Sequence, residues 1–170
     1  MAGMFVGEYT FKVDGKGRMS IPADYRRELE ACDLQRPNEN RPRIAIVATP
    51  NKSHLECHSY DDFRRMAADI ANMDRGSMQR RILERMVLGA TTFVEVEPDG
   101  RLVLPQKLRE KIGLSSEALF LGQGETFTIW NPETFAAEDQ AQIDGWLEEM
   151  PADFDVYSLL GAAKTPSAGG

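Results

Sequence analysis

The feature that most constrains the fold of this chain is an internal repeat. Residues 14–22 and 97–105 align at an offset of 83, and each contains a Gly-Arg pair followed by a short apolar run and a proline. A second match, at an offset of 72, places residues 55–63 over residues 127–135. Two matches in the same order indicate a duplication. The pairs of matching residues are Asp14 and Glu97, Gly17 and Gly100, Arg18 and Arg101, Pro22 and Pro105, and Arg26 and Arg109.

Each copy has the same predicted order of elements. A short strand leads into the glycine-containing turn, where glycine tolerates a positive φ. A second strand ends at the proline, and a helix begins there because proline suits the first helical turn. A β-hairpin and a further helix complete the copy, and residues 75–88 form an amphipathic helix between the copies. In the first and second copy respectively, these elements are residues 9–13 and 92–96, 19–21 and 102–104, 23–29 and 106–112, 44–48 and 118–121, 54–58 and 126–130, and 60–69 and 132–146.

The duplication also predicts how the two halves combine. A unit of four short strands and one short helix buries little apolar surface alone, so we expect the copies to share one core as a pseudo-dimer. The predicted division is a first unit at residues 4–70, a connecting helix at 71–89, a second unit at 90–147 and a tail at 148–170. The tail is acidic at first, and from residue 162 onward its small, polar composition predicts disorder.

Charge is divided unevenly between the two halves. The 170 residues have a formal net charge of −7. Residues 1–85 contain 15 Lys and Arg against 13 Asp and Glu, whereas residues 86–170 contain 5 against 14. The N-terminal half is therefore the part expected to meet phosphates, although an ordinary solvated surface would give the same balance.

Several functional classes find no support in the sequence. No apolar run approaches the roughly 18 residues that span a membrane, and residues 1–9 have no secretory-signal pattern, which predicts a cytosolic protein. Neither Cys32 nor Cys57 belongs to a C-x-x-C pair. The Gly122-Gln-Gly124 stretch lacks the third glycine of a dinucleotide site, and no catalytic constellation is present. We therefore predict no enzymatic activity, no cofactor and no small-molecule substrate.

A metal site is the remaining chemical alternative. His54, Cys57 and His58 lie close together in sequence and are of types that ligate zinc, which usually takes four ligands. The second copy lacks ligating residues at the matching positions, which indicates a structural strand, and we predict no metal. Those positions are Thr126, Ile129 and Trp130.

Three stretches together resemble the MraZ family: Phe5-Val-Gly-Glu-Tyr, Asp14-Gly-Lys-Gly-Arg-Met-Ser-Ile-Pro-Ala-Asp-Tyr-Arg26, and the second Asp-Gly-Arg-Leu-Val-Leu-Pro. The resemblance covers roughly residues 4–143. It implies an α+β fold, an internally duplicated swapped-hairpin (AbrB-like, double-psi-like) β-barrel with short flanking helices. It further implies a nucleoid-associated transcriptional regulator, a repressor of the division and cell-wall gene cluster, that binds repeated short boxes of double-stranded DNA as a ring-shaped homo-oligomer.

Basic residues around the two turns are the candidates for DNA contact. A two-stranded β-ribbon fits the major groove, where arginine can donate two hydrogen bonds to guanine, whereas lysine more often contacts phosphate. The first copy, which is richer in basic residues, is expected to supply most of the contact. The predicted DNA-binding residues are Lys12, Lys16, Arg18, Arg26, Arg27, Arg101, Lys107 and Arg109, and the predicted structural turn residues are Asp14, Gly17, Glu97 and Gly100.

Two alternatives stay open at the level of sequence. Arg18 could pair with Asp14, and Arg101 with Glu97, so that both arginines brace the turns; Arg26 and its neighbour Arg27 could belong to a solvated helix face. The whole chain could also be a protein-interaction or scaffold module with the same duplicated fold and no DNA contact.

Overall fold

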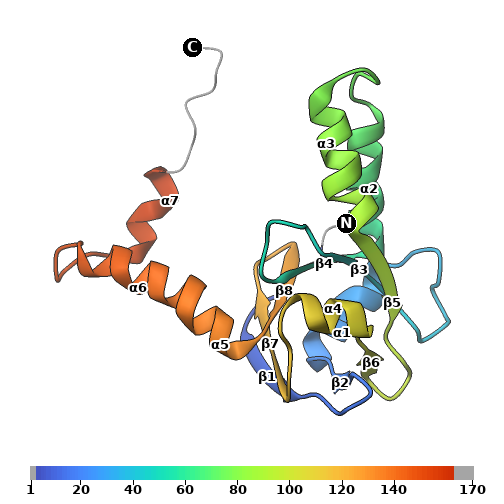
Figure 1. The fold of residues 1–170 in the computed structure, drawn as a ribbon, viewed down its shortest axis with the longest axis horizontal. Coiled ribbons are helices and arrows are strands. Elements are labelled where there is room, and N and C mark those ends of the chain that lie inside the picture. Colours follow the sequence, from blue (N-terminus) through green and yellow to red (C-terminus); the bar gives the residue numbers. More distant parts are fainter. Residues whose placement is uncertain (1–2, 163–170) are drawn as a thin grey trace. The chain divides into compact units, whose positions relative to one another are not determined.

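A computed structural model describes residues 3–162 of the chain, which divides into two compact units. The first unit is Met1–Phe135 and contains every strand of the described residues (Figure 1). The second is Ala136–Gly170, which is helical apart from short turns where it is described. The predicted disordered end lies, apart from Ala162, outside the described residues.

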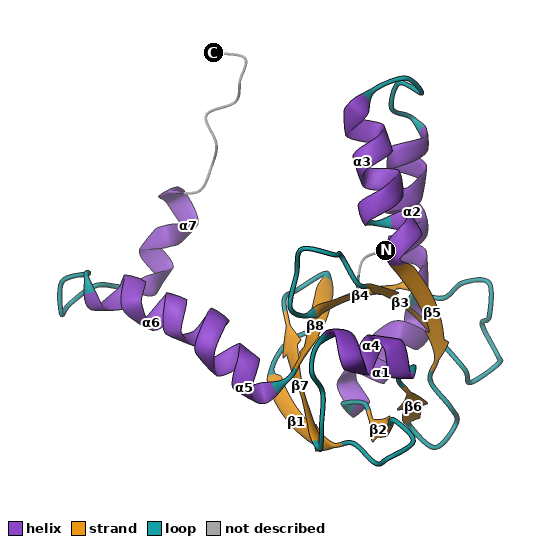
Figure 2. Cartoon of the chain, in the orientation of Figure 1, coloured by secondary structure: helices purple, strands orange, loops and turns teal. Residues whose placement is uncertain are grey.

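The strands of residues 3–162 form two antiparallel sheets (Figure 2). The larger sheet has six strands in the order β1-β7-β8-β4-β3-β5, and β2 pairs with β6 in a separate two-stranded ribbon. The predicted hairpins β3–β4 and β7–β8 are both present. The strands are β1 (Glu8–Lys12), β2 (Arg18–Ser20), β3 (Arg43–Val47), β4 (Leu55–Ser59), β5 (Thr91–Glu95), β6 (Arg101–Val103), β7 (Glu117–Gly122) and β8 (Thr126–Trp130).

Strand pairing joins the two copies of the repeat throughout the first unit. β1 of the first copy pairs with β7 of the second, and β5 of the second copy pairs with β3 of the first. The pairs β4–β8 and β2–β6 each join equivalent strands. The main core accordingly contains buried side chains of both copies, such as Ile44 and Ile129. Neither copy forms the main core alone, although each also has a small apolar cluster beside it.

The predicted closed barrel is not formed by residues 3–162. β1 and β5 are the outer strands of the larger sheet and do not pair with each other, so this sheet is open. The sheet stays open because β2 and β6, the strands that follow the two Gly-Arg turns, pair with each other and do not extend the larger sheet. The mixed α+β class with short helices is confirmed.

Alternation along β3 shows how the sheet is covered on both faces. Ile44 and Ile46 point into the main core, while Ala45 and Val47 pack against Phe63 of α2. Successive residues of a strand point to opposite faces, so one apolar run can serve two layers.

Proline and serine mark the starts of the main helices. α1 (Ala23–Ala31) follows Pro22, and α4 (Gln106–Lys111) follows Pro105, as predicted. α2 (Tyr60–Ala71) and α3 (Met78–Met86) begin after serines whose hydroxyls accept a backbone hydrogen bond, a common N-cap arrangement. These two helices lie side by side and project from the sheets as a helical hairpin (Figure 1). The predicted amphipathic helix between the copies is α3.

The remaining helical segments are short. None of the helices within residues 3–162 is both long enough and apolar enough to cross a membrane. The segments are η1 (Leu88–Ala90), α5 (Pro132–Thr134), the π-helix η2 (Phe135–Gln140), α6 (Ala141–Glu148), η3 (Val156–Ser158) and α7 (Leu159–Ala162).

Candidate nucleic-acid interface

The two Gly-Arg turns lead into one shared two-stranded ribbon. In its antiparallel register Met19 lies opposite Leu102, and Ser20 lies opposite Arg101. Met19 and Leu102 are buried in the main core, so the alternate residues, including Arg18 and Arg101, point outward. The register makes these two arginines diagonal neighbours on the exposed face, roughly 7–8 Å apart between Cα atoms. One arginine from each copy therefore reaches the same surface.

Asp14 holds the first turn through three hydrogen bonds. Its carboxylate accepts from the backbone N–H groups of Lys16 and Arg18, both at 2.9 Å, and from Arg18 Nε at 3.0 Å. The backbone N–H of Arg18 is the main cause that holds the pKa of Asp14 below its ordinary value; desolvation opposes it, and the Arg18 guanidinium lowers the pKa further. The ion pair that the sequence left open as an alternative is thus present. Within residues 3–162 the terminal N–H groups of Arg18 have no acceptor, which leaves them available to one outside the protein.

The second turn has the same backbone conformation as the first, but a different side chain holds it. Gly100 has a φ of 82°, close to the 86° of Gly17, and its N–H donates to Glu97 O at 2.9 Å. The backbone N–H of Arg101 donates to Asp99 Oδ1 at 3.1 Å. No ion pair joins Arg101 to Glu97 in the described part of the chain, so the Arg101 guanidinium has no internal carboxylate partner.

Arg26 and Arg109, which match in the repeat, are both engaged inside the protein. Arg26 Nη1 donates to Pro98 O, in the second turn, at 2.8 Å, and Arg109 Nε donates to Leu104 O at 2.9 Å. A Cβ atom added to Gly17 would lie 2.7 Å from Arg109 Nε, so Arg109 packs directly over the first turn. Each helix arginine thereby secures the turn of the other copy. The contact of these two residues with DNA stays a prediction.

The other four candidates are exposed cations. Lys12 ends β1, Lys16 lies at the tip of the first turn, Arg27 is on α1 and Lys107 is on α4. Arg27 pairs with Asp24 at 2.9 Å, whereas the three lysines form no ion pair within residues 3–162. Of all eight candidates, four lie on the ribbon or close to it in sequence, and we call them the ribbon cations: Lys12, Lys16, Arg18 and Arg101.

The three residues considered for zinc do not converge. The His54 ring stacks on Trp130 with 4.3 Å between centroids, while Cys57 lies in the main core and His58 faces Asp62. Burial raises the pKa of the Cys57 thiol, which disfavours the thiolate that binds metals. Across residues 3–162, no three His, Cys, Asp or Glu side chains are grouped so that they could hold a metal ion.

His58 is instead a buried residue between two carboxylates. Its Nδ1 lies 3.1 Å from Asp62 Oδ2, and its Nε2 lies 3.5 Å from Glu56 Oε1. Burial alone would lower the pKa of His58, but the contacts with Glu56 and then Asp62 outweigh burial and raise the pKa above 6.5. The fold thus favours the imidazolium form.

We expect the free energy of unfolding to fall as the pH rises from 6 to 8. The stabilisation from protonated His58 is fully present below the unfolded pKa of about 6.5 and is lost as the pH passes through the raised folded pKa. In urea denaturation at several pH values, His58→Gln should be less stable than the wild type at pH 6 and show a flatter profile. His54→Gln, at the other histidine, should keep the decline. A His58→Gln profile as steep as that of the wild type would contradict this assignment.

The fold and interface define a class of protein, a duplicated α+β chain whose interleaved halves present one shared basic ribbon. Comparison with known proteins identifies the family. The model of the family described as MraZ protein matches residues 4–85 and again residues 86–144. The chain belongs to the MraZ family, as its sequence motifs suggested.

The similarity to individual relatives extends over nearly the whole chain. The chain is 44% identical to the transcriptional regulator MraZ of Ruegeria pomeroyi over 164 residues, which cover 96% of this chain and 98% of the relative. It is 38% identical to the protein of that name from Cereibacter sphaeroides over 167 residues, covering 94% and 97%. For the Coxiella burnetii protein of the same name, the identity is 28% over 153 residues, covering 90% and 94%.

Proposed function

We propose that this protein is a transcriptional regulator that binds double-stranded DNA through the exposed face of the β2–β6 ribbon. The observation that carries the proposal is the placement of Arg18 and Arg101 on one outward face, with no carboxylate of the described chain paired to Arg101. A two-stranded ribbon can enter the major groove, where arginine recognises the edge of guanine. The name transcriptional regulator, which the relatives have in common, supports this function.

Within the proposed interface, the residues have different roles. Arg18 and Arg101 contact base edges, and Lys12 and Lys16 contact phosphates on either side of the first turn, because lysine acts mainly as a point charge. Three of the four ribbon cations belong to the first copy, so this copy supplies most of the phosphate contact. Lys107 on α4 is a further phosphate contact at the second copy.

The finer features are also proposals. The protein acts as a repressor of the division and cell-wall gene cluster, and several copies bind repeated short boxes in the promoter, where linked binding events raise the overall affinity. The functional units are residues 4–70 and 90–147, joined by residues 71–89, and their interleaving follows the swapped-hairpin pattern. Such a protein works in the cytoplasm, associated with the nucleoid.

A scaffold without DNA contact is the second candidate function. The exposed apolar side chains Met78 and Ile82 of α3 favour it, because a surface of this kind commonly binds protein. Only the DNA-binding function predicts an affinity for DNA that falls as the salt concentration rises.

A gel-shift series with DNA from upstream of the protein's own gene cluster tests the proposal. If about three phosphates are neutralised per bound chain, by Lys12, Lys16 and Lys107, the association constant should fall roughly 40-fold between 50 and 200 mM salt. Scrambled DNA of equal length is the control for specificity. Absence of binding at low salt, or binding indifferent to salt, would favour the scaffold.

A further inference from the structure

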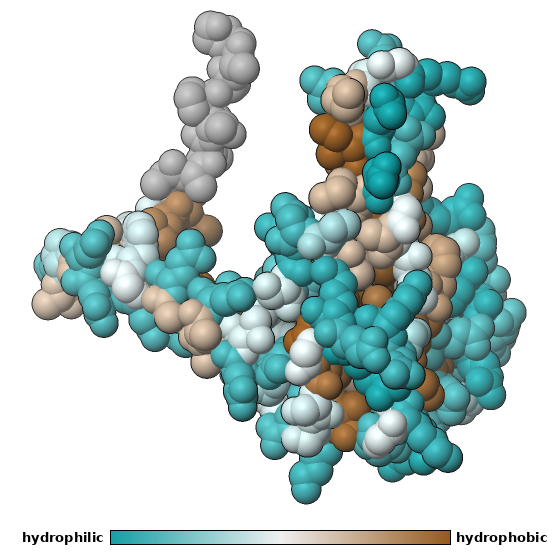
Figure 3. Space-filling view, viewed as in Figure 1, coloured by the Kyte–Doolittle hydropathy of each residue, from teal (hydrophilic) through white to brown (hydrophobic). Residues whose placement is uncertain are grey.

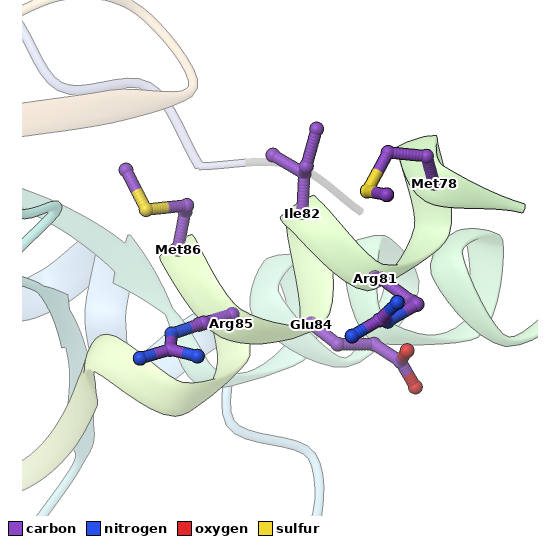
Figure 4. Close-up of a pocket in the computed structure, with 6 residues that line it drawn as sticks. All are labelled: Met78, Arg81, Ile82, Glu84, Arg85 and Met86. Atoms are coloured by element: carbon purple, nitrogen blue, oxygen red, sulfur yellow. The ribbon is translucent and has the colours of Figure 1, made fainter.

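One side of α3 is an apolar stripe flanked by arginines. Met78, Ile82 and Met86 recur every four residues and point the same way, with Arg81 and Arg85 along the adjoining side (Figure 4). Met78 is 59% exposed and Ile82 is 51% exposed. Together these five residues form what we call the α3 face, which borders a shallow hollow of about 550 Å³. Figure 3 shows hydrophobic residues at the surface of the α2–α3 hairpin.

The charge of this face is positive and is not neutralised internally. Residues 75–86 contain four arginines and one glutamate. Arg80 is used within the hairpin, where its Nη1 donates to Met73 O at 2.8 Å. By contrast, Arg81 and Arg85 are exposed and form no ion pair within residues 3–162. The sequence alone shows two arginines four residues apart beside an apolar stripe, but it does not show that this side of the helix is exposed.

The second unit has the opposite charge and also exposes apolar side chains. We call residues 136–162 the acidic arm, because they contain seven Asp and Glu and no Lys or Arg. Ile143, Trp146 and Leu147 of α6 line a hollow of about 420 Å³, and Ile143 is 51% exposed. No side chain of residues 136–161 is fully buried. The helical stretch of η2 and α6 is about as long as the shortest helices that are stable in water without packing partners, so a surface that covers its apolar side chains would stabilise the arm.

We infer that the acidic arm of one copy docks on the α3 face of a second copy. The apolar side chains of α6 cover Met78, Ile82 and Met86, while the carboxylates around them meet Arg81 and Arg85. This inference rests on the part of the proposed function in which copies assemble, and it names the surfaces that join them.

Charge favours this pairing over pairing of like surfaces. Two acidic arms would bring seven carboxylates against seven, and two α3 faces would bring arginines against arginines, both of which are unfavourable. Docking an arm on a different surface of the next copy gives a head-to-tail contact, which generates a ring if the rotation closes and an open chain if it does not.

Light scattering on the full chain with reversed charges tests the inference. The wild type should have a mass several times that of the 19.0 kDa chain. Arg81→Glu with Arg85→Glu, and separately Asp144→Lys with Glu148→Lys, should each shift most of the protein to 19.0 kDa. Mixing the two variants should restore the assembly. The unchanged acidic arm of the first variant meets the unchanged arginines of the second, and the new lysines of the second meet the new glutamates of the first. Circular dichroism shows whether each variant keeps the wild-type helix content and melting temperature.

Several outcomes would overturn the inference. The first is a wild type with a mass of 19.0 kDa, which docking of an arm on its own chain would give. The others are folded variants that keep the mass of the assembly, and a mixture of variants that fails to reassemble. Lys12→Glu with Lys16→Glu is the control matched to Arg81→Glu with Arg85→Glu, because it changes the net charge by the same amount; it should reduce DNA binding and leave the mass unchanged. Assembly without any DNA binding would therefore count against the proposed function alone, and DNA binding without these contacts would count against the docking alone.

Discussion

Replacing both outward arginines of the ribbon, by Arg18→Glu with Arg101→Glu, should lower the affinity for operator DNA at least about 100-fold at moderate salt. Loss of a single arginine contact with a base costs roughly 1–3 kcal/mol, and the new carboxylates add repulsion from phosphate. Both side chains are exposed, and Arg18→Glu removes only a surface ion pair with Asp14, so the melting temperature should fall by no more than a few degrees. Affinity is measured by fluorescence anisotropy with labelled promoter DNA, and stability by thermal denaturation.

A matched control separates the position of these charges from their number. Arg64→Glu with Arg75→Glu reverses the same number of arginines on the α2–α3 hairpin, away from the ribbon, and should retain most of the affinity. The single variants then divide the effect between the copies. A loss from Arg101→Glu as large as that from Arg18→Glu would show that both copies contact DNA equally. If the double variant binds like the wild type, the ribbon is not the DNA-binding surface.

Tyr25→Ala should produce the largest loss of stability of any substitution considered. The Tyr25 ring lies among Phe5, Tyr9, Phe120 and Phe127, with the Phe127 centroid 4.9 Å away. Removing a buried aromatic ring costs about 3–5 kcal/mol, which corresponds to a fall of roughly 10 °C or more in melting temperature. Urea denaturation followed by circular dichroism gives the free energy directly.

The Tyr25 hydroxyl allows the ring to be separated from its polar group. It donates to Gly7 O at 2.8 Å, and burial raises its pKa, so the group is protonated at all physiological pH values. Tyr25→Phe keeps the packing and loses this bond, for an expected cost of about 1 kcal/mol. Tyr157→Ala, at a tyrosine that is 77% exposed, should be close to neutral. Equal losses for the Phe and Ala variants would show that the hydrogen bond, not the ring, is the main contribution.

The sequence predicts those parts of the fold that depend on neighbouring residues. The hairpins β3–β4 and β7–β8, the helices after Pro22 and Pro105, and α3 all follow from local turn signals and periodicity. The choice of partner for each strand does not follow from such local signals. The residue pattern of β1 and β7 does not distinguish this pair from any other pair of strands, and the pairing depends on how the whole core is buried. An open sheet instead of a barrel is a result of that selection.

For the candidate DNA-binding site too, the sequence predicts local features but not contacts between distant residues. The sequence places arginines beside both turns, and the repeat points to their equivalence. It does not show that Asp14 braces the first turn whereas Asp99 contacts the second, or that Arg26 reaches Pro98, 72 residues away. These contacts depend on the interleaving of the copies, which brings the helix of one copy over the turn of the other.

The interleaved strands have a consequence for synthesis on the ribosome. Lys12 of β1 pairs with Glu117 of β7, so the first strand to be made has no partner until more than 100 further residues have been translated. Contacts between such distant residues form slowly, and an unpaired strand edge can meanwhile join another chain. A truncated message that stops after the first copy would therefore yield chains whose strands pair with those of other chains, whereas the complete chain satisfies the same strands within itself.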